Sequence, residues 1–321
     1  MNKPGRMPLR CLLAGAFALL LLHGGVSAAD LLRIGSPTAG SPNVAPIGLA
    51  SELGYFSEVG LDVVITNFRG GSAAQESLLT GDSDIVSTGF GSLAQAVIRG
   101  VKNRCVAPQT DRWTGWALML PPGSKVSDPR QLAGTRVGIT AAGSLSDFLI
   151  AWTEKNYGIE LDRVPLGTAN LIQSAANSGQ IQAFISWTPV VYSQLRENKA
   201  RRLLDFGRDM PPQYAGCWAA LDNVVDRNPE KMRKFAAVYL KALKHMKDNP
   251  EAATVYLMKF SSITDRRIAD DIYNGLVAST LSGTMSVEPA MVSEALSFAS
   301  LPALRPIQLF NDKLYQIAGS R

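Results

Sequence analysis

Three turns in the chain place a glycine directly before a serine, at Ser72, Ser92 and Ser144. Each serine is followed three residues later by glutamine or aspartate, a pattern typical of a helix that begins at the serine. The first N–H groups of a helix have no partner within it, and the helix dipole adds positive charge there. The turns therefore predict helix tips that can hold a small anion, with simple helix capping as the alternative.

Other side chains near these turns could also contact a ligand. Arg69 could bind a sulfonate or carboxylate through two hydrogen bonds, although it could equally be a solvated arginine. Thr38 and Asn43 belong to the first strand-to-helix turn or to an ordinary polar loop. Phe90 and Trp187 could cover an organic ligand, with core packing as the alternative. The candidate ligand-binding residues are Thr38, Asn43, Arg69, Gly71, Ser72, Phe90, Gly91, Ser92, Gly143, Ser144, Trp187 and Thr188.

Strands and helices alternate along most of the chain. Strands are predicted at 31–35, 61–65, 85–87 and 104–106, and a second series follows at 136–140, 163–166, 183–187 and 200–206. Helices are expected between them, including one that starts at Thr188 as N-cap with Pro189 in its first turn. This alternation favours parallel pairing in doubly wound sheets, whose ligands bind at the carboxyl ends of the strands.

The predicted fold is α/β with two lobes, each built on a doubly wound, mostly parallel sheet. Residues 116–120 read as a strand that leaves the first lobe, and residues 217–225 as a strand that returns to it. Lobe 1 is therefore expected to comprise 30–116 and 217–321, and lobe 2 to comprise 117–216. From Asn228 onward the chain is expected to be mostly helical.

Residues 1–29 are predicted to be a secretory signal peptide. Lys3, Arg6 and Arg10 precede an apolar run at 11–22, and the small residues at 26–29 fit a cleavage site. A membrane anchor needs about 20 apolar residues, more than this run provides. Cleavage removes three basic and no acidic side chains from a formal charge of +5, which leaves +2. This near-neutral balance gives no reason to expect nucleic-acid binding.

Two cysteines, Cys105 and Cys217, follow the signal peptide. In an oxidising compartment they could form a disulfide, or they could be two small buried apolar side chains. His245 is the only histidine left after cleavage, and the sequence has no cluster of cysteine and histidine. We therefore expect neither a metal nor a cofactor.

Several motifs, in order and spacing, resemble the nitrate/sulfonate/taurine (thiamine-precursor-like) class of periplasmic substrate-binding proteins of ABC transporters. The resemblance covers about residues 31–253, and its motifs lie at 54–63, 70–72, 79–84, 128–138 and 143–144. The sequence departs from the family pattern at Gln182, where aspartate is usual, and at Thr188, where glutamate is common.

The resemblance implies a monomeric periplasmic receptor that closes on a small molecule, here expected to be an anion, and delivers it to an ABC transporter permease. Two chain crossings, at 109–116 and 210–218, would form its hinge. They would also bring Cys105 and Cys217 onto neighbouring strands, which favours the disulfide.

Two other functions remain open. Enzymes of related fold act on biosynthetic precursors, and Asp111, Asp147 or Asp222 could serve as a general acid or base. The signal peptide weighs against this reading. A ligand-sensing partner of a membrane receptor would share the same fold and cleft.

Overall fold

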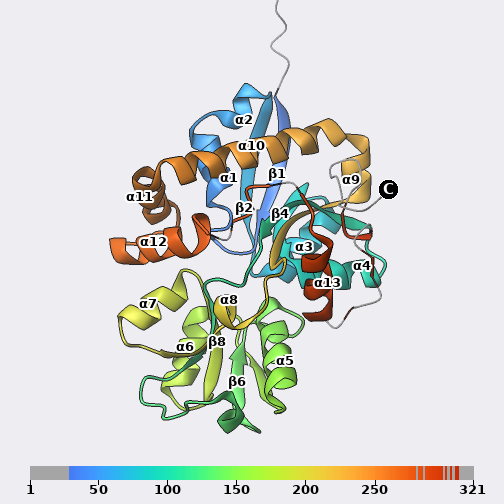
Figure 1. The fold of residues 1–321 in the computed structure, drawn as a ribbon. Coiled ribbons are helices and arrows are strands. Elements are labelled where there is room, and N and C mark those ends of the chain that lie inside the picture. The colour runs from blue at the N-terminus through green and yellow to red at the C-terminus, as the bar shows by residue number, and fades with distance from the viewer. Residues whose placement is uncertain are drawn as a thin grey trace, which may run out of the picture.

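The computed structural model describes residues 29–279, 281–284, 286–298, 301, 304–305 and 308–310. Two five-stranded sheets, each flanked by helices, form two lobes that lie one above the other in Figure 1. The predicted two-lobed α/β fold is confirmed. The predicted signal peptide lies almost wholly outside the described residues.

The sheet of lobe 1 has the strand order β2-β1-β3-β10-β4, and only β10 runs antiparallel to its neighbours. All five residues of β3 are buried, which is typical of a central strand covered by helices on both faces. The strands are β1 (Asp30–Ser36), β2 (Leu61–Asn67), β3 (Ile85–Gly89), β4 (Asn103–Thr110) and β10 (Gly216–Leu221).

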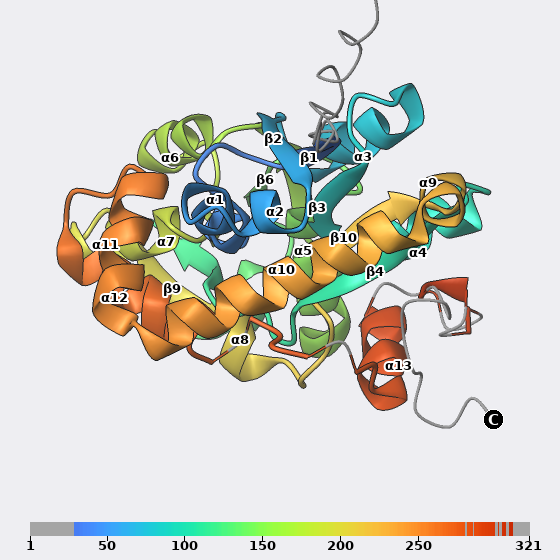
Figure 2. The ribbon, with the colours of Figure 1, turned by 90° about the horizontal axis from the view of Figure 1, so that it is seen from above.

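Helices cover both faces of the lobe 1 sheet. The longest, α10 (Pro229–Asp248), begins with Asn228 as N-cap and crosses one face in Figure 2. It packs Phe235 and Tyr239 against Trp218 of β10, at ring distances of 5.4 and 5.9 Å. The same face carries α1 (Ala45–Glu52), α2 (Tyr55–Glu58), α11 (Pro250–Phe260), α12 (Arg266–Ile272) and η2 (Tyr273–Val277). The other face carries α3 (Gly71–Thr80), α4 (Phe90–Ile98) and α13 (Pro289–Phe298).

The sheet of lobe 2 repeats this topology, with the order β7-β6-β8-β5-β9 and β5 as its antiparallel strand. Its strands are β5 (Trp116–Leu120), β6 (Arg136–Ile139), β7 (Asp162–Pro165), β8 (Ala183–Trp187) and β9 (Arg201–Asp205). Its helices are η1 (Pro129–Leu132), α5 (Leu145–Tyr157), α6 (Ala169–Asn177), α7 (Val190–Arg196) and α8 (Phe206–Asp209).

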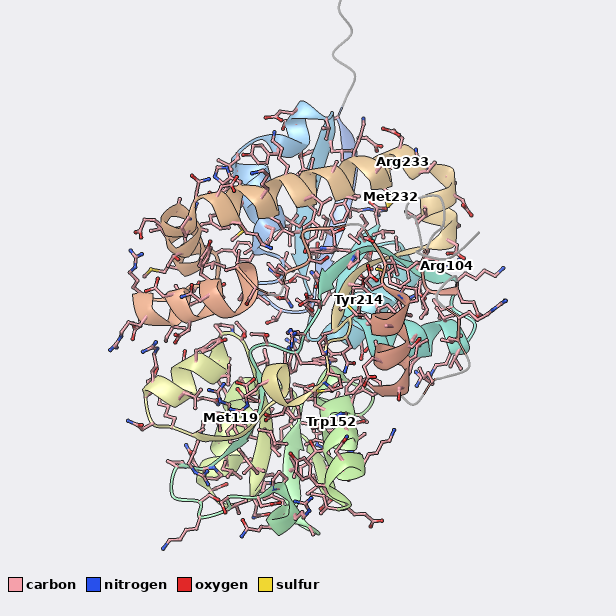
Figure 3. The ribbon with its side chains drawn as sticks, viewed as in Figure 1. Arg104, Met119, Trp152, Tyr214, Met232 and Arg233 are labelled. Carbon is pink, nitrogen blue, oxygen red and sulfur yellow. The ribbon has the colours of Figure 1, made fainter. Side chains whose placement is uncertain are left out.

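Figure 3 locates side chains in the two lobes: Met119 and Trp152 lie in lobe 2, and Tyr214 and Met232 lie in lobe 1. The chain passes between the sheets twice, after β4 and before β10. At these crossings the Gln213 N–H donates to the Asp111 carbonyl (3.0 Å), and the Ala215 N–H donates to the Thr110 carbonyl (3.0 Å). The two crossings therefore run side by side, as a hinge requires. Residues 116–120, predicted as a strand leaving lobe 1, pair within the lobe 2 sheet, whereas the lobe boundaries at 116 and 217 remain a prediction.

One strand prediction is wrong in part. The returning strand ends at Leu221 instead of residue 225, and a short helix, α9 (Asp222–Arg227), follows at once. Among the helices of the described residues, none combines the length and the apolar composition that a membrane span requires.

Cys105 and Cys217, considered above as a possible disulfide, are free thiols that are fully buried. Ala219, not Cys217, lies opposite Cys105 in the β4–β10 pair. Cys217 lies opposite Pro108, and a bulge separates these two pairs, so the two cysteines are not direct cross-strand partners. Burial and contact with Cys105 raise the pKa of the Cys217 thiol.

Candidate ligand-binding site

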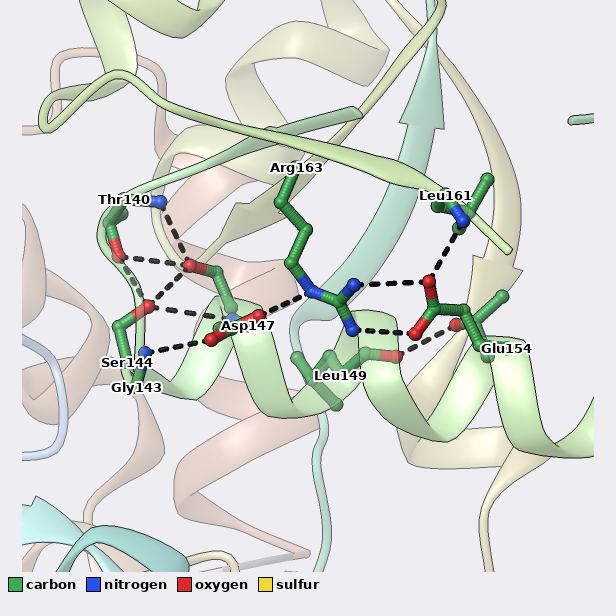
Figure 4. Close-up of polar contacts among 10 residues, drawn as sticks. Thr140, Gly143, Ser144, Asp147, Leu149, Glu154, Leu161 and Arg163 are labelled. Carbon is green, nitrogen blue, oxygen red and sulfur yellow. Dashed lines mark hydrogen bonds and ion pairs between the residues drawn. The ribbon is translucent and has the colours of Figure 1, made fainter. Parts of the chain in front are cut away.

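Three hydroxyl groups meet where β6 leads into α5 in lobe 2 (Figure 4). Thr140 Oγ1 lies 2.9 Å from both Ser144 Oγ and Ser146 Oγ, and the two serine oxygens are 2.7 Å apart. The Thr140 N–H also donates to Ser146 Oγ at 2.9 Å. This network fixes the turn at the carboxyl end of β6.

Ser144 is the N-cap of α5, as predicted. Its oxygen accepts from the Asp147 N–H (3.4 Å) and from the Thr140 hydroxyl. A serine hydroxyl has two acceptor lone pairs and one proton, so its acceptor capacity is filled. Ser144 therefore donates its own proton to Ser146 Oγ, and its hydroxyl is committed within the turn.

The Gly143 N–H is already committed within its own turn, because it donates to Asp147 Oδ2 at 2.7 Å. Asp147 also accepts from Arg163 (2.6 Å), which in turn bonds Glu154. Burial opposes the charge on Arg163, but the hydrogen bonds and charges of Glu154 and Asp147 outweigh it and raise the Arg163 pKa. The negative charge of Asp147 is thus balanced by Arg163.

The unpaired amides of this turn are those of Leu145 and Ser146. Neither makes a hydrogen bond to another described residue. They are the first two residues of α5, where the helix dipole is positive. The sequence pattern located this helix tip, but it did not indicate that Asp147 would accept from the Gly143 N–H.

In lobe 1 the predicted capping boxes at Ser72 and Ser92 are wrong. The N-caps are Gly70 and Gly89, so both serines lie inside the first turn of their helices, α3 and α4. Gly70 has φ 99°, a backbone conformation that strongly favours glycine and starts α3 before the serine. Neither serine hydroxyl is committed to a cap, and the amides of Gly71 and Ser72 have no hydrogen bond to a described residue.

A cavity of about 210 Å³ lies between α3, α4 and the turn before α5. Its wall includes Ser72 and Ser92 from lobe 1 and Gly143 from lobe 2. Two buried amide atoms in this wall, Gln75 Nε2 and Asn103 Oδ1, have no hydrogen-bond partner. The structure therefore brings the three predicted turns together at one cavity shared by the two lobes.

Nine of the twelve predicted site residues, Ser144 among them, do not line this cavity. Thr38 and Arg69 are exposed, and Asn43 is half-buried, with its carbonyl accepting from Gln109 Nε2 (3.2 Å). The Trp187 ring lies 6.0 Å from that of Trp116, at the end of β8. The Thr188 hydroxyl donates to the Gly115 carbonyl (3.2 Å) and caps no helix, since α7 starts only at Val190, after Pro189. The expected Thr188 cap is therefore wrong.

Phe90 and Gly91 are buried at the start of α4. The Phe90 ring is fully buried and packs on Phe310 (5.6 Å) and Tyr214 (6.0 Å). The expectation that Phe90 faces a ligand is wrong: it belongs to the core of lobe 1. Gly71, half-buried as the first residue of α3, is the immediate neighbour of the cavity residue Ser72.

Comparison with known proteins identifies the family. Residues 41–253 match the family described as NMT1/THI5 like. A Brucella abortus (strain 2308) protein, named as a candidate binding protein, is 24% identical over 231 residues, covering 71% of this chain and 70% of its own.

Solved structures share the fold. The periplasmic aliphatic sulphonate binding protein SsuA of Escherichia coli superposes with a TM-score of 0.72 at 18% identity, over 87% of this chain and 96% of its own. The periplasmic nitrate-binding protein NrtA of Synechocystis PCC 6803 gives 0.68 at 14% identity, over 90% and 86%.

Two mixed sheets joined by two crossings, with a cavity lined by both lobes, define the periplasmic solute-binding protein fold. Within that class, the chain belongs to the NMT1/THI5-like family, because the family match spans more than half of the length of this chain.

Proposed function

We propose that this protein is an extracytoplasmic receptor that captures a small organic or inorganic anion, such as a sulfonate, between its lobes and delivers it to an ABC importer. The observation that carries the proposal is the cavity lined by Ser72 and Ser92 from one lobe and Gly143 from the other. A ligand held there contacts both lobes and so favours the closed state.

The donors around the cavity support an acceptor-rich ligand. The amide of the cavity residue Ser72 makes no hydrogen bond to a described residue, and neither do the amides of Leu145 and Ser146, which follow the cavity residue Gly143 by two and three positions. Arg99 adds positive charge to the wall, opposed by Glu76. The names of the sulphonate- and nitrate-binding relatives in fold point to the same ligand class.

The proposed location is the periplasm, reached through the signal peptide predicted at 1–29, and the proposed partner is a membrane permease. The relatives in fold named above are periplasmic by name. We propose that the protein acts as a monomer without a cofactor.

The carboxylates considered for catalysis do not line the cavity. Asp147 pairs with Arg163, and Asp222 pairs with Arg104. Burial raises the pKa of Asp111, which lies at the hinge crossing. We therefore propose binding without catalysis, since none of the three carboxylates lies in the wall of the cavity.

A thermal-shift screen tests the proposal, with taurine, alkyl and aryl sulfonates, nitrate and aromatic carboxylates set against neutral heterocycles. A ligand at 100 times its Kd stabilises the folded protein by about 2.7 kcal/mol. We expect an anion to raise the Tm, and we expect Ser72→Phe to abolish that rise. Ser57→Phe, an equally exposed change on α2, is the matched control. A shift produced only by neutral heterocycles would overturn the anion assignment, and consumption of the ligand would favour an enzyme.

A further inference from the structure

A second contact between the lobes lies away from the serine turns, where α7 of lobe 2 meets α12 of lobe 1, on the left of Figure 1. Arg196 at the end of α7 donates to Asp271 Oδ2 from Nη2 (2.6 Å) and from Nε (2.9 Å). The same Nη2 also donates to the carbonyl of Arg267 at 3.3 Å. One guanidinium thus contacts both a side chain and the backbone of α12.

This ion pair differs from the others in what it joins. Among the ion pairs of the described residues, each of the others connects two groups within the same lobe. Arg196–Asp271 alone connects lobe 2 with lobe 1. In this structure it therefore holds the end of α7 against α12 across the two lobes.

Tyr192 lies one turn before Arg196 and packs against both lobe cores. Its hydroxyl lies 2.9 Å from where a Cβ on Gly275 would be, so it fits closely against η2. Burial raises the pKa of Tyr192 to about 12, which keeps its hydroxyl neutral. The charge interaction at this contact therefore comes from Arg196 and Asp271.

Water can reach the ion pair. A cavity of about 250 Å³ beside it is lined by Ser193 and Arg196 from α7 and by Ser261, Ser262 and Arg267 from lobe 1. The side chains of Arg196 and Asp271 are 32% and 37% exposed. A pair with this exposure contributes modestly and responds to salt.

We propose that Arg196 and Asp271 form an electrostatic latch that holds α7 against α12 and stabilises the closed receptor before any ligand arrives. The latch touches no part of the ligand cavity, so it acts by positioning the two halves of that cavity. Because apparent affinity scales with the fraction of protein in the binding-competent state, the latch also sets how tightly the receptor binds. This inference rests on the lobe closure that the proposed function requires.

The test measures lobe separation in the ligand-free protein, so it does not depend on which ligand is found. Cysteines placed at the exposed Leu53 of lobe 1 and Leu171 of lobe 2 carry nitroxide labels for pulsed EPR distances. The native thiols are fully buried and stay unlabelled. Asp271→Asn removes the latch charge with little change of shape. Glu251→Gln removes the partner of Arg266, an ion pair confined to lobe 1, as the matched control.

We expect Asp271→Asn to lower the closed-to-open ratio about two- to fivefold, the range for a half-exposed pair. The double variant R196D/D271R should restore it, and Glu251→Gln should leave it unchanged. In the parent protein, 1 M NaCl should act like Asp271→Asn, and it should add little to that variant. If circular dichroism shows that a variant has lost its fold, the salt titration of the parent protein tests the latch instead.

Equal distance distributions for Asp271→Asn and Glu251→Gln would overturn the latch. A salt-insensitive parent distribution would overturn it too. Neither result would bear on ligand capture at the serine turns, which the thermal-shift screen tests separately.

Discussion

Leu145, the first residue of α5 in lobe 2, packs directly on Gly89, the last residue of β3 in lobe 1. A Cβ built on Gly89 would lie 1.9 Å from Leu145 Cδ2. The backbone of Gly89, at φ −73° and ψ 142°, suits any L-residue. Only the approach of Leu145 therefore calls for glycine at this position.

Gly89→Ala should keep the lobes from closing fully while leaving lobe 1 folded. Overpacking costs about 1–3 kcal/mol, so we expect about tenfold weaker binding of the anion found in the screen, measured by isothermal titration calorimetry. Gly123→Ala is the control, since a Cβ there meets open space. The double variant G89A/L145A should regain affinity. If it does not, the effect of Gly89→Ala does not arise at this contact.

Ser144→Ala separates ligand binding from helix capping. Thr168 caps α6 in the same lobe through a bond of 3.4 Å to the Leu171 N–H, equal in length to the bond of Ser144 to the Asp147 N–H. Each alanine variant should therefore lose about 1 kcal/mol of stability in urea unfolding. Only Ser144→Ala should also weaken anion binding. Equal affinities for the two variants would remove Ser144 from the site.

Asp147→Asn tests whether the bound solute is charged. The amide oxygen can still accept from the Gly143 N–H, but Arg163 then loses one of its two balancing carboxylates. An anion near the start of α5 should bind about two- to fivefold more tightly, as expected for 0.5–1 kcal/mol of added attraction. A neutral ligand should show no change in calorimetry. Unaltered anion affinity would contradict an anion bound at this turn.

Asp84 makes the stability of lobe 1 depend on pH. Burial disfavours its charge, but three hydrogen bonds from Arg33 outweigh burial and lower the pKa of the carboxyl. Because the folded pKa is depressed, this stabilisation is present above the unfolded pKa of about 3.9 and is lost as the pH falls through the folded value.

Asp84→Asn should therefore cost about 1–3 kcal/mol of unfolding free energy at pH 7, and the difference from the parent protein should shrink below about pH 4. Urea unfolding at pH 7 and below pH 4 measures this difference in unfolding free energy. Asp62→Asn, at an exposed site on β2, should have little effect at either pH. If the difference in unfolding free energy between Asp84→Asn and the parent protein were as large below pH 4 as at pH 7, it could not be assigned to the Asp84 charge.

The fold was largely predictable because strand and helix patterns are local, whereas the site depended on single turns. The Ser144 cap could be predicted because no glycine N-cap starts α5 before it. The same pattern failed at Ser72 and Ser92, where Gly70 and Gly89 end the preceding segment first. A rule based on residue spacing cannot detect a shift of two or three residues in where a helix begins.

Contacts between distant segments were beyond the reach of sequence patterns. Phe90 sits at a junction of strand and helix, and nothing local tells whether its ring faces the core or the cleft. The approach of Leu145 to Gly89, and that of Arg196 to Asp271, join residues that are far apart in the chain. No motif of fixed spacing in the sequence indicates either contact.

The reversed strand β10 sets an order of assembly for the nascent polypeptide. The only ladder partner of β4 within the described chain is β10, which also borders β3. All five strands of the lobe 2 sheet, by contrast, come from one uninterrupted stretch of sequence between them. The second lobe can thus complete its sheet as soon as its own stretch of chain is available, while the first must wait for the stretch that follows it.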